Sequence, residues 1–171
     1  MTLLSSLFPR KDDRAALRPL YAAVVAQART PHWYLAGGVA DTIDGRFDMV
    51  ASILSLVLMR MDTLGLKGEA ARLTELFIDD MEGQVRQIGF GDLVVGKQVG
   101  RMVGALGGRL AAYRAGLAGE APLRDALVRN LYRGEAPADA ALAHVEDRLR
   151  AYAAALDGLD GAALLAGRLP D

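Results

Sequence analysis

The chain has 171 residues, with 20 basic and 21 acidic side chains and a formal net charge of −1. This balance excludes a histone-like polycation and an acidic disordered tail. The absence of cysteine excludes disulfides, zinc fingers, iron–sulfur clusters and thiol nucleophiles. Alanine (30 residues), leucine (27) and arginine (17) dominate, and all three favour helices. The composition predicts an all-α fold, a single compact helical domain of about six to eight helices.

The predicted elements follow one another as helices separated by short turns. Asp12 or Asp13 can cap a first helix that extends to about Arg29. This helix ends at Thr30, because a proline pushes the residue before it out of the helical conformation. After a loop at 39–46, further helices are expected at 47–64, 69–88, 92–117, 122–133 and from 137 to about 156, with a last turn at 162–168.

The loop at 39–46 concentrates charged residues around a glycine. Asp44 and Gly45 are typical of a tight turn in which the glycine takes a positive φ. Arg46 follows, and its planar guanidinium suits a directional pair with Asp41, with Asp44 or with an acid on a neighbouring helix. This group of residues either clamps the loop onto the helices or contacts a binding partner.

The helix expected at 92–117 carries an unusual pattern of glycines. A turn from Gly89 to Gly91 precedes it, and Asp92 is placed to cap it. Glycines then recur every four residues, on a stripe away from the apolar face of the helix: Gly96, Gly100, Gly104 and Gly108. Each interior glycine costs a helix about 1 kcal/mol relative to alanine. We therefore expect a second backbone close to the stripe, either from another helix of this domain, which is the first expectation, or from a partner helix in an open groove.

No catalytic set of residues is evident in the sequence. Glu75, Asp79 and Glu82 share one helical face and could present carboxylates to a metal. The Glu-x-x-His pairs of di-iron helical proteins are missing, however, so a solvated acidic face is the simpler interpretation. His32 and His144 are interpreted as ordinary polar residues. We expect no enzyme activity, cofactor or metal, and a carboxylate-dependent metal-binding helical enzyme is the alternative.

The first 11 residues form a segment of their own ahead of a helical domain at 12–171. An apolar patch lies directly before two bases, a pattern that suits contact with a bilayer surface; the residues are Leu3, Leu4, Leu7, Phe8, Arg10 and Lys11. The order of apolar and charged residues is wrong for a signal peptide. Farther along, residues 86–133 hold 8 bases against 3 acids. This basic stretch either complements the acidic segments around it or contacts RNA or anionic lipid.

Four blocks of the sequence, taken in order, resemble the ubiquinol–cytochrome c chaperone family. Residues 39–49, VADTIDGRFDM, are similar to the family's V-P-D-T-x-D-G-R-F segment, with alanine in place of the usual proline. The other blocks lie within 80–97, which contains GFGDLVVGK, and at 108–113 and 129–132. Ile53 stands where many members carry histidine, and Val85 and Gln87 replace a leucine and a glutamate.

The resemblance implies an all-helical assembly factor that is not an enzyme. Members of the family bind newly made cytochrome b and assist assembly of the respiratory bc1 complex, and mitochondrial members work at the ribosome with a small partner subunit. For this chain the resemblance implies an apolar cytochrome b segment as client and no DNA partner. It also implies a location in the cytoplasm or peripherally on the cytosolic face of the inner membrane. The further alternative for the function is a protein that binds the ribosome or an RNA surface. The candidate client-binding or structural residues are Asp41, Asp44, Gly45, Arg46, Phe47, Gly89, Gly91, Asp92, Gly96, Lys97, Gly100, Gly104, Gly108 and Arg109.

Overall fold

The computed structural model describes residues 14–87, 89 and 91–171, and within these ranges every regular element is an α-helix. The predicted all-α fold in one helical domain is confirmed. The helices are α2 (Arg18–Ala28), α3 (Pro31–Leu35), α4 (Ile43–Thr63), α5 (Lys67–Gln87), α6 (Asp92–Leu117), α7 (Leu123–Asn130), α8 (Asp139–Asp157) and α9 (Gly161–Leu165). The N-terminal segment at 1–11 and the proposed caps at positions 12 and 13 lie outside the described residues.

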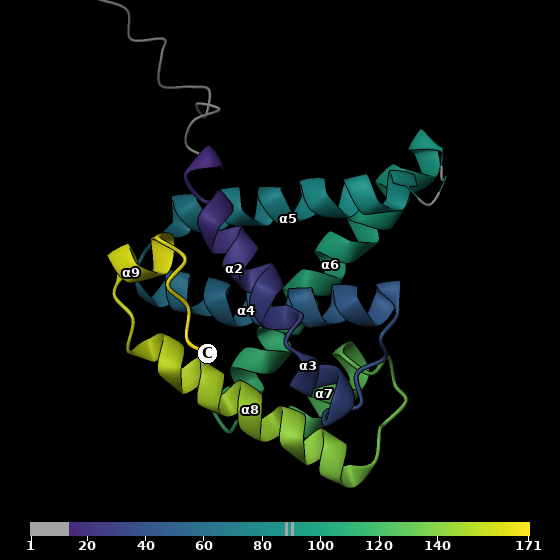
Figure 1. Cartoon of the computed structure of the whole chain (residues 1–171), viewed down its shortest axis with the longest axis vertical. Helices are drawn as coiled ribbons and strands as arrows, with labels where there is room; N and C mark the ends of the chain where they lie inside the picture. The colour runs from purple at the N-terminus through teal and green to yellow at the C-terminus, as the bar shows by residue number, and fades with distance from the viewer. Residues whose placement is uncertain (1–13, 88, 90) are drawn as a thin grey trace, which may run out of the picture.

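Helix α4 forms the centre of the core. Figure 1 shows it between α5 and α8, with α2 crossing it and α6 slanting from the end of α5 toward α7. It packs against α2, α5, α6 and α8, and every residue from Phe47 to Leu58 is buried. A helix that is apolar nearly all round is stable only when it is covered on all sides. None of the described helices combines the length and the apolar character that crossing a membrane requires.

Helix α4 begins four residues before the predicted start, inside the charged segment. Thr42 is its N-cap, and the Thr42 Oγ1 accepts the backbone N–H of Gly45 at 3.1 Å. Gly45 therefore lies in the first helical turn, and the prediction that it takes a positive φ is wrong. The glycine is required for another reason, since a Cβ at this position would lie 1.9 Å from the carbonyl oxygen of Ala40.

The start of α6 also differs from the prediction. Gly89 takes a φ of 93°, as a tight glycine turn requires. The N-cap of α6 is Gly91, whose backbone is extended at φ −70° and ψ 159°, so the prediction that Asp92 caps this helix is wrong. Asp92 is the first helical residue instead, because the change from extended to helical backbone occurs between these two positions.

The glycine stripe of α6 faces away from the domain. The inner face of α6 buries Val95, Val99, Leu106 and Tyr113 and packs on α4, α5 and α7. The glycines at 96, 100, 104 and 108 are exposed, and a Cβ built at any of them meets no described atom within 4 Å apart from its chain neighbours and the nearby backbone of α6 itself. The expectation that another helix of this domain packs against the stripe is therefore wrong for the described chain. Among the described residues, the buried contacts of α6 come from its inner face.

Candidate functional site

The charged segment at the start of α4 leads to a buried carboxylate, Asp48. The Asp48 Oδ1 accepts a hydrogen bond from Arg109 Nη2 at 2.8 Å, and its Oδ2 accepts one from Arg133 Nε at 2.6 Å. Only 6% of the Asp48 side chain is exposed. Arg109 belongs to α6 and Arg133 to the turn after α7. One carboxylate thus joins three parts of the chain that are far apart in the sequence.

Arg109 is the buried cation of this site, with 3% of its surface exposed. Its Nη2 also donates to the backbone carbonyl of Asn130, at the C-terminal end of α7. Its Nε and Nη1 are buried and have no hydrogen-bond acceptor among the described atoms. Burying an unpaired donor of a charged group is costly. The hydrogen bonding of this guanidinium is therefore incomplete.

Arg133 completes the group from the turn after α7. It has a φ of 55°, in the left-handed region that residues other than glycine seldom adopt. Its Nη1 donates to Asp44 at 2.8 Å, so its planar fork bridges two acids spaced one helical turn apart on α4. Partial burial alone would lower the pKa of Arg133, but the hydrogen bonds and charges of Asp48 and Asp44 raise it above its ordinary value.

A short polar network continues from Asp48 into the core. The Ser52 hydroxyl donates to the backbone carbonyl of Asp48 at 2.7 Å and lies 2.9 Å from the Tyr113 hydroxyl. Because Ser52 has one proton and gives it to the carbonyl, the Tyr113 hydroxyl is the donor to Ser52. Burial raises the pKa of Tyr113. The network adds a second polar link between α4 and α6, next to the Asp48–Arg109 pair.

The Arg46–Asp41 pair forms as predicted, but on the surface. Arg46 Nε donates to Asp41 Oδ1 at 2.6 Å, and this hydrogen bond holds the pKa of Asp41 below its ordinary value. More than half of each side chain is exposed. The buried pair in this part of the chain is Arg109 with Asp48, and the expected clamping of the loop by Arg46 has only this exposed pair behind it.

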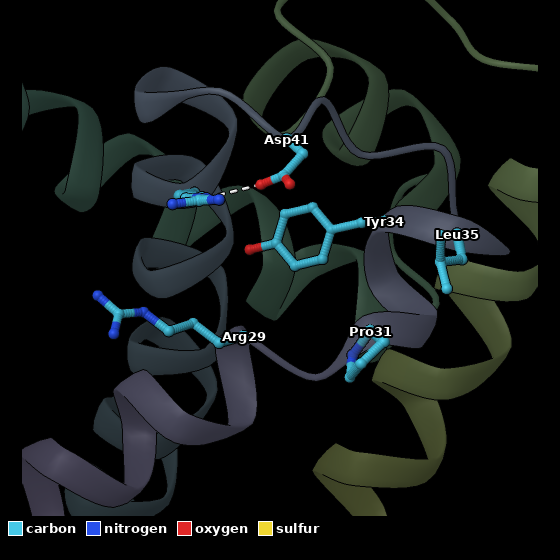
Figure 2. A pocket seen from close by; sticks show the side chains of 6 residues that line it. Arg29, Pro31, Tyr34, Leu35 and Asp41 are labelled. Carbon is cyan, nitrogen blue, oxygen red and sulfur yellow. Dashed lines mark hydrogen bonds and ion pairs between the residues drawn. The ribbon is translucent and has the colours of Figure 1, made fainter.

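An open cleft of about 450 Å³ lies beside this surface pair. Figure 2 shows Tyr34 at its centre, with Pro31 and Leu35 on one side and Asp41 on the other. The Tyr34 hydroxyl donates to the backbone carbonyl of Ala28 at 2.9 Å, so α3 and the end of α2 hold the ring in place. The cleft combines apolar walls with one ion pair, which suits non-covalent binding.

The other predicted candidates fall into separate places. Phe47 is a core residue whose ring stacks on Phe77 at 5.7 Å between centroids. Lys97 is exposed on α6, near the glycine stripe. The position of Asp92 is described but its side chain is not. The predicted set therefore divides between the N-terminal end of α4, with Arg109 beside it, and the length of α6.

The acidic face of α5 is occupied by a cation from the chain itself. Arg14 forms ion pairs with Glu75 and Asp79. Among the described residues, no three His, Asp or Glu side chains lie close enough to hold a metal ion. These carboxylates thus help to attach the start of the described chain to α5.

Sequence reasoning missed Asp48 and Arg133 as site residues. Asp48 belongs to the first family block, and its i,i+4 spacing from Asp44 is the signal that could have identified it. No comparable signal marks Arg133, which lies in the turn after α7 with a left-handed backbone.

Comparison with known proteins identifies a family and a solved structure that this chain resembles. A family model described as ubiquinol-cytochrome C chaperone matches residues 35–170. The structure is similar to a crystal structure of the Cbp3 homolog from Brucella abortus, with a TM-score of 0.79 and 28% identity, over 93% of this chain and 90% of the other. No curated protein matches the chain. The chain belongs to the ubiquinol–cytochrome c chaperone family.

Proposed function

We propose that this protein is an assembly chaperone for the respiratory bc1 complex and that it binds newly made cytochrome b through non-covalent contacts. The observation that carries the proposal is the family match, which extends over residues 35–170 and includes Asp41, Arg46, Asp48, Arg109 and Arg133. A chaperone of an apolar client needs exposed apolar surface that can be covered and released.

The cleft in Figure 2 supplies such a surface and supports its role as the client contact. Leu35, on its wall, is 86% exposed. Ile43 lies outside the cleft lining, two residues after Asp41, and is 60% exposed at the start of α4. Burying apolar surface contributes about 25 cal/mol per Å². A client segment that covers these two side chains gains this energy, and the neighbouring ion pair offers polar groups that orient it.

The exposed Asp41–Arg46 pair favours a client contact over a clamp. A surface ion pair contributes little to folding, and the buried Asp48 already ties the start of α4 to α6. Because the fold does not depend on Asp41 and Arg46 for its stability, these two residues are available for recognition.

We place the protein in the cytoplasm, in peripheral contact with the inner membrane through residues 1–11. The support is the apolar patch and the two bases of that segment. Liposome flotation of the full chain and of a chain that starts at residue 12 tests this placement. The full chain is expected to float better with anionic liposomes, and equal flotation would contradict the placement. A ribosome contact and a small partner subunit stay predictions of the family resemblance.

Copurification from native membranes tests the client. The wild-type protein is expected to recover cytochrome b, and Leu35→Ser and Ile43→Ser are each expected to recover less at an unchanged melting temperature. Ala154→Ser, at an exposed position of α8, is the matched control and is expected to behave as wild type. Absence of cytochrome b from the wild-type sample would overturn the proposal. Equal recovery with Leu35→Ser and Ala154→Ser would overturn the role of the cleft, and the Ile43→Ser result reports on the surface next to it.

A further inference from the structure

A second cleft, of about 550 Å³, lies over the buried Asp48 group and has a different character from the cleft of Figure 2. Residues of α4, α6 and the α7 end line it, among them four arginines and two aspartates. The arginines are Arg101, Arg109, Arg129 and Arg133, and the aspartates are Asp44 and Asp48. Its lining therefore carries a formal excess of two positive charges.

The buried Arg109 in this cleft has unused hydrogen-bonding capacity. Its Nη2 is satisfied by Asp48 and Asn130, which also line the cleft. Its Nε and Nη1 have no acceptor among the described atoms, although the residue is only 3% exposed. A buried guanidinium normally fills its donors with carboxylate, carbonyl or phosphate oxygens. Oxygens brought by a ligand would complete this set.

Arg101 and Arg129, at the exposed edge of the cleft, also have unused hydrogen-bonding capacity. Both are exposed, and neither forms an ion pair with any residue that the structure describes. Arg133, by contrast, is held by Asp44 and Asp48. Two free guanidinium groups from α6 and α7 thus face a cleft whose floor holds a third that is only partly bonded.

We propose that this cleft is a phosphate-binding site. A phosphate monoester carries a charge of about −1.5 to −2 at neutral pH and three strong acceptor oxygens. That charge balances the excess of two positive charges in the lining, and the acceptors match donors that arrive from two different helices. The exposed Arg101 and Arg129 offer the first contacts, and the buried Arg109 adds positive charge beneath them. The phosphate comes either free in solution or as the headgroup of an anionic lipid.

Calorimetric titration of the full chain with inorganic phosphate, at constant ionic strength, tests the site. Arg101→Gln and Arg129→Gln are each expected to weaken binding about tenfold or more, because each removes a charge-assisted hydrogen bond. Neither side chain has a partner among the described residues, so both variants are expected to fold with the wild-type melting temperature. Arg168→Gln is the matched control, because it removes one exposed charge far along the chain and is expected to leave binding unchanged.

Vesicles distinguish the two sources of phosphate. Binding of inorganic phosphate that depends on Arg101 and Arg129 supports a site for the free ion. Binding only to phosphatidylcholine vesicles that contain phosphatidic acid, with the same dependence, supports a lipid headgroup. No binding in either arm, or equal loss with Arg168→Gln, would overturn the proposal, as would binding of an RNA oligonucleotide without binding of inorganic phosphate. Because cytochrome b is absent from these assays, their result is independent of the proposed chaperone function.

Discussion

Asp48 and Arg109 form a buried ion pair, with 2.8 Å between Oδ1 and Nη2, that ties the central helix α4 to α6. Breaking a buried pair by removing one partner is far more costly than breaking a surface pair, because the remaining charge is left without compensation in the interior. The same segment carries the exposed Asp41–Arg46 pair. The two pairs offer a direct test of which one holds the fold.

Asp48→Asn is expected to lower the free energy of unfolding by about 3–5 kcal/mol, because the uncharged amide leaves Arg109 uncompensated. Urea denaturation followed by circular dichroism measures this change. Arg46→Ala is the control, since the Arg46 side chain is exposed, and it is expected to change stability little. A loss of stability with Arg46→Ala as large as that with Asp48→Asn would contradict this assignment.

Two helical glycines are expected to respond to alanine with opposite signs. Gly45→Ala brings a Cβ against the Ala40 carbonyl oxygen, which cannot move without distorting the turn before α4. Such overpacking costs typically about 1–3 kcal/mol, so stability falls. Gly100→Ala adds a methyl group in open space and is expected to raise stability by about 1 kcal/mol through helix propensity.

Thermal denaturation of both variants checks this pair. A rise in melting temperature with Gly45→Ala, or a fall with Gly100→Ala, would contradict the structure at that position. Recovery of cytochrome b with Gly100→Ala bears on a separate question. A reduced recovery despite higher stability would favour a client helix on the glycine stripe.

The sequence predicts the features of the fold that depend on composition and on spacing along one helix. Composition and the long apolar run at 49–59 identify an all-helical fold with a buried central helix, because burial on all sides is the only stable place for such a helix. The spacing of the glycines likewise identifies a single stripe on α6. Spacing along one helix does not reveal what lies opposite that stripe. In the described part of the chain, no other segment packs against it.

The site was less predictable because its contacts join distant segments. Asp48 meets Arg109 across 61 positions and Arg133 across 85 positions. A single sequence shows local turns and helix faces but does not pair one arginine with one aspartate over such separations. Gly45 illustrates the same limit. A glycine is required there because the backbone at Ala40 leaves no room for a Cβ, and the sequence does not show how close that backbone passes.

Stability is expected to fall as the pH drops below about 7, through His32, which meets His144 between α3 and α8. His32 Nδ1 lies 3.1 Å from His144 Nε2. Burial, with the charges of Arg148 and His144, lowers the pKa of His32 from 6.5. Above this pH both folded and unfolded chains hold a neutral His32. As the pH falls through 6.5 the unfolded chain takes up the proton first, so unfolding becomes more favourable.

Melting temperatures between about pH 8 and pH 5 measure this effect. His32→Gln removes the group and is expected to give a shallower decline than wild type over that range. The pKa of Glu146 is also shifted: burial alone would raise it, but hydrogen bonds from Arg150 and Arg124 lower it below 4.5. Protonation of Glu146 therefore reduces stability only at a pH below the range in which His32 acts. Wild-type stability that is constant or rising toward pH 5 would contradict the account of His32.

Site-specific photo-crosslinking in intact cells tests the proposal that cytochrome b binds at the cleft beside Tyr34. A photoreactive amino acid replaces Leu35, which is 86% exposed on the cleft wall, or Ala154 on α8 as the control. We predict a crosslink between position 35 and newly made cytochrome b and none from position 154. No crosslink from position 35, or equal crosslinks from both positions, would contradict the claim.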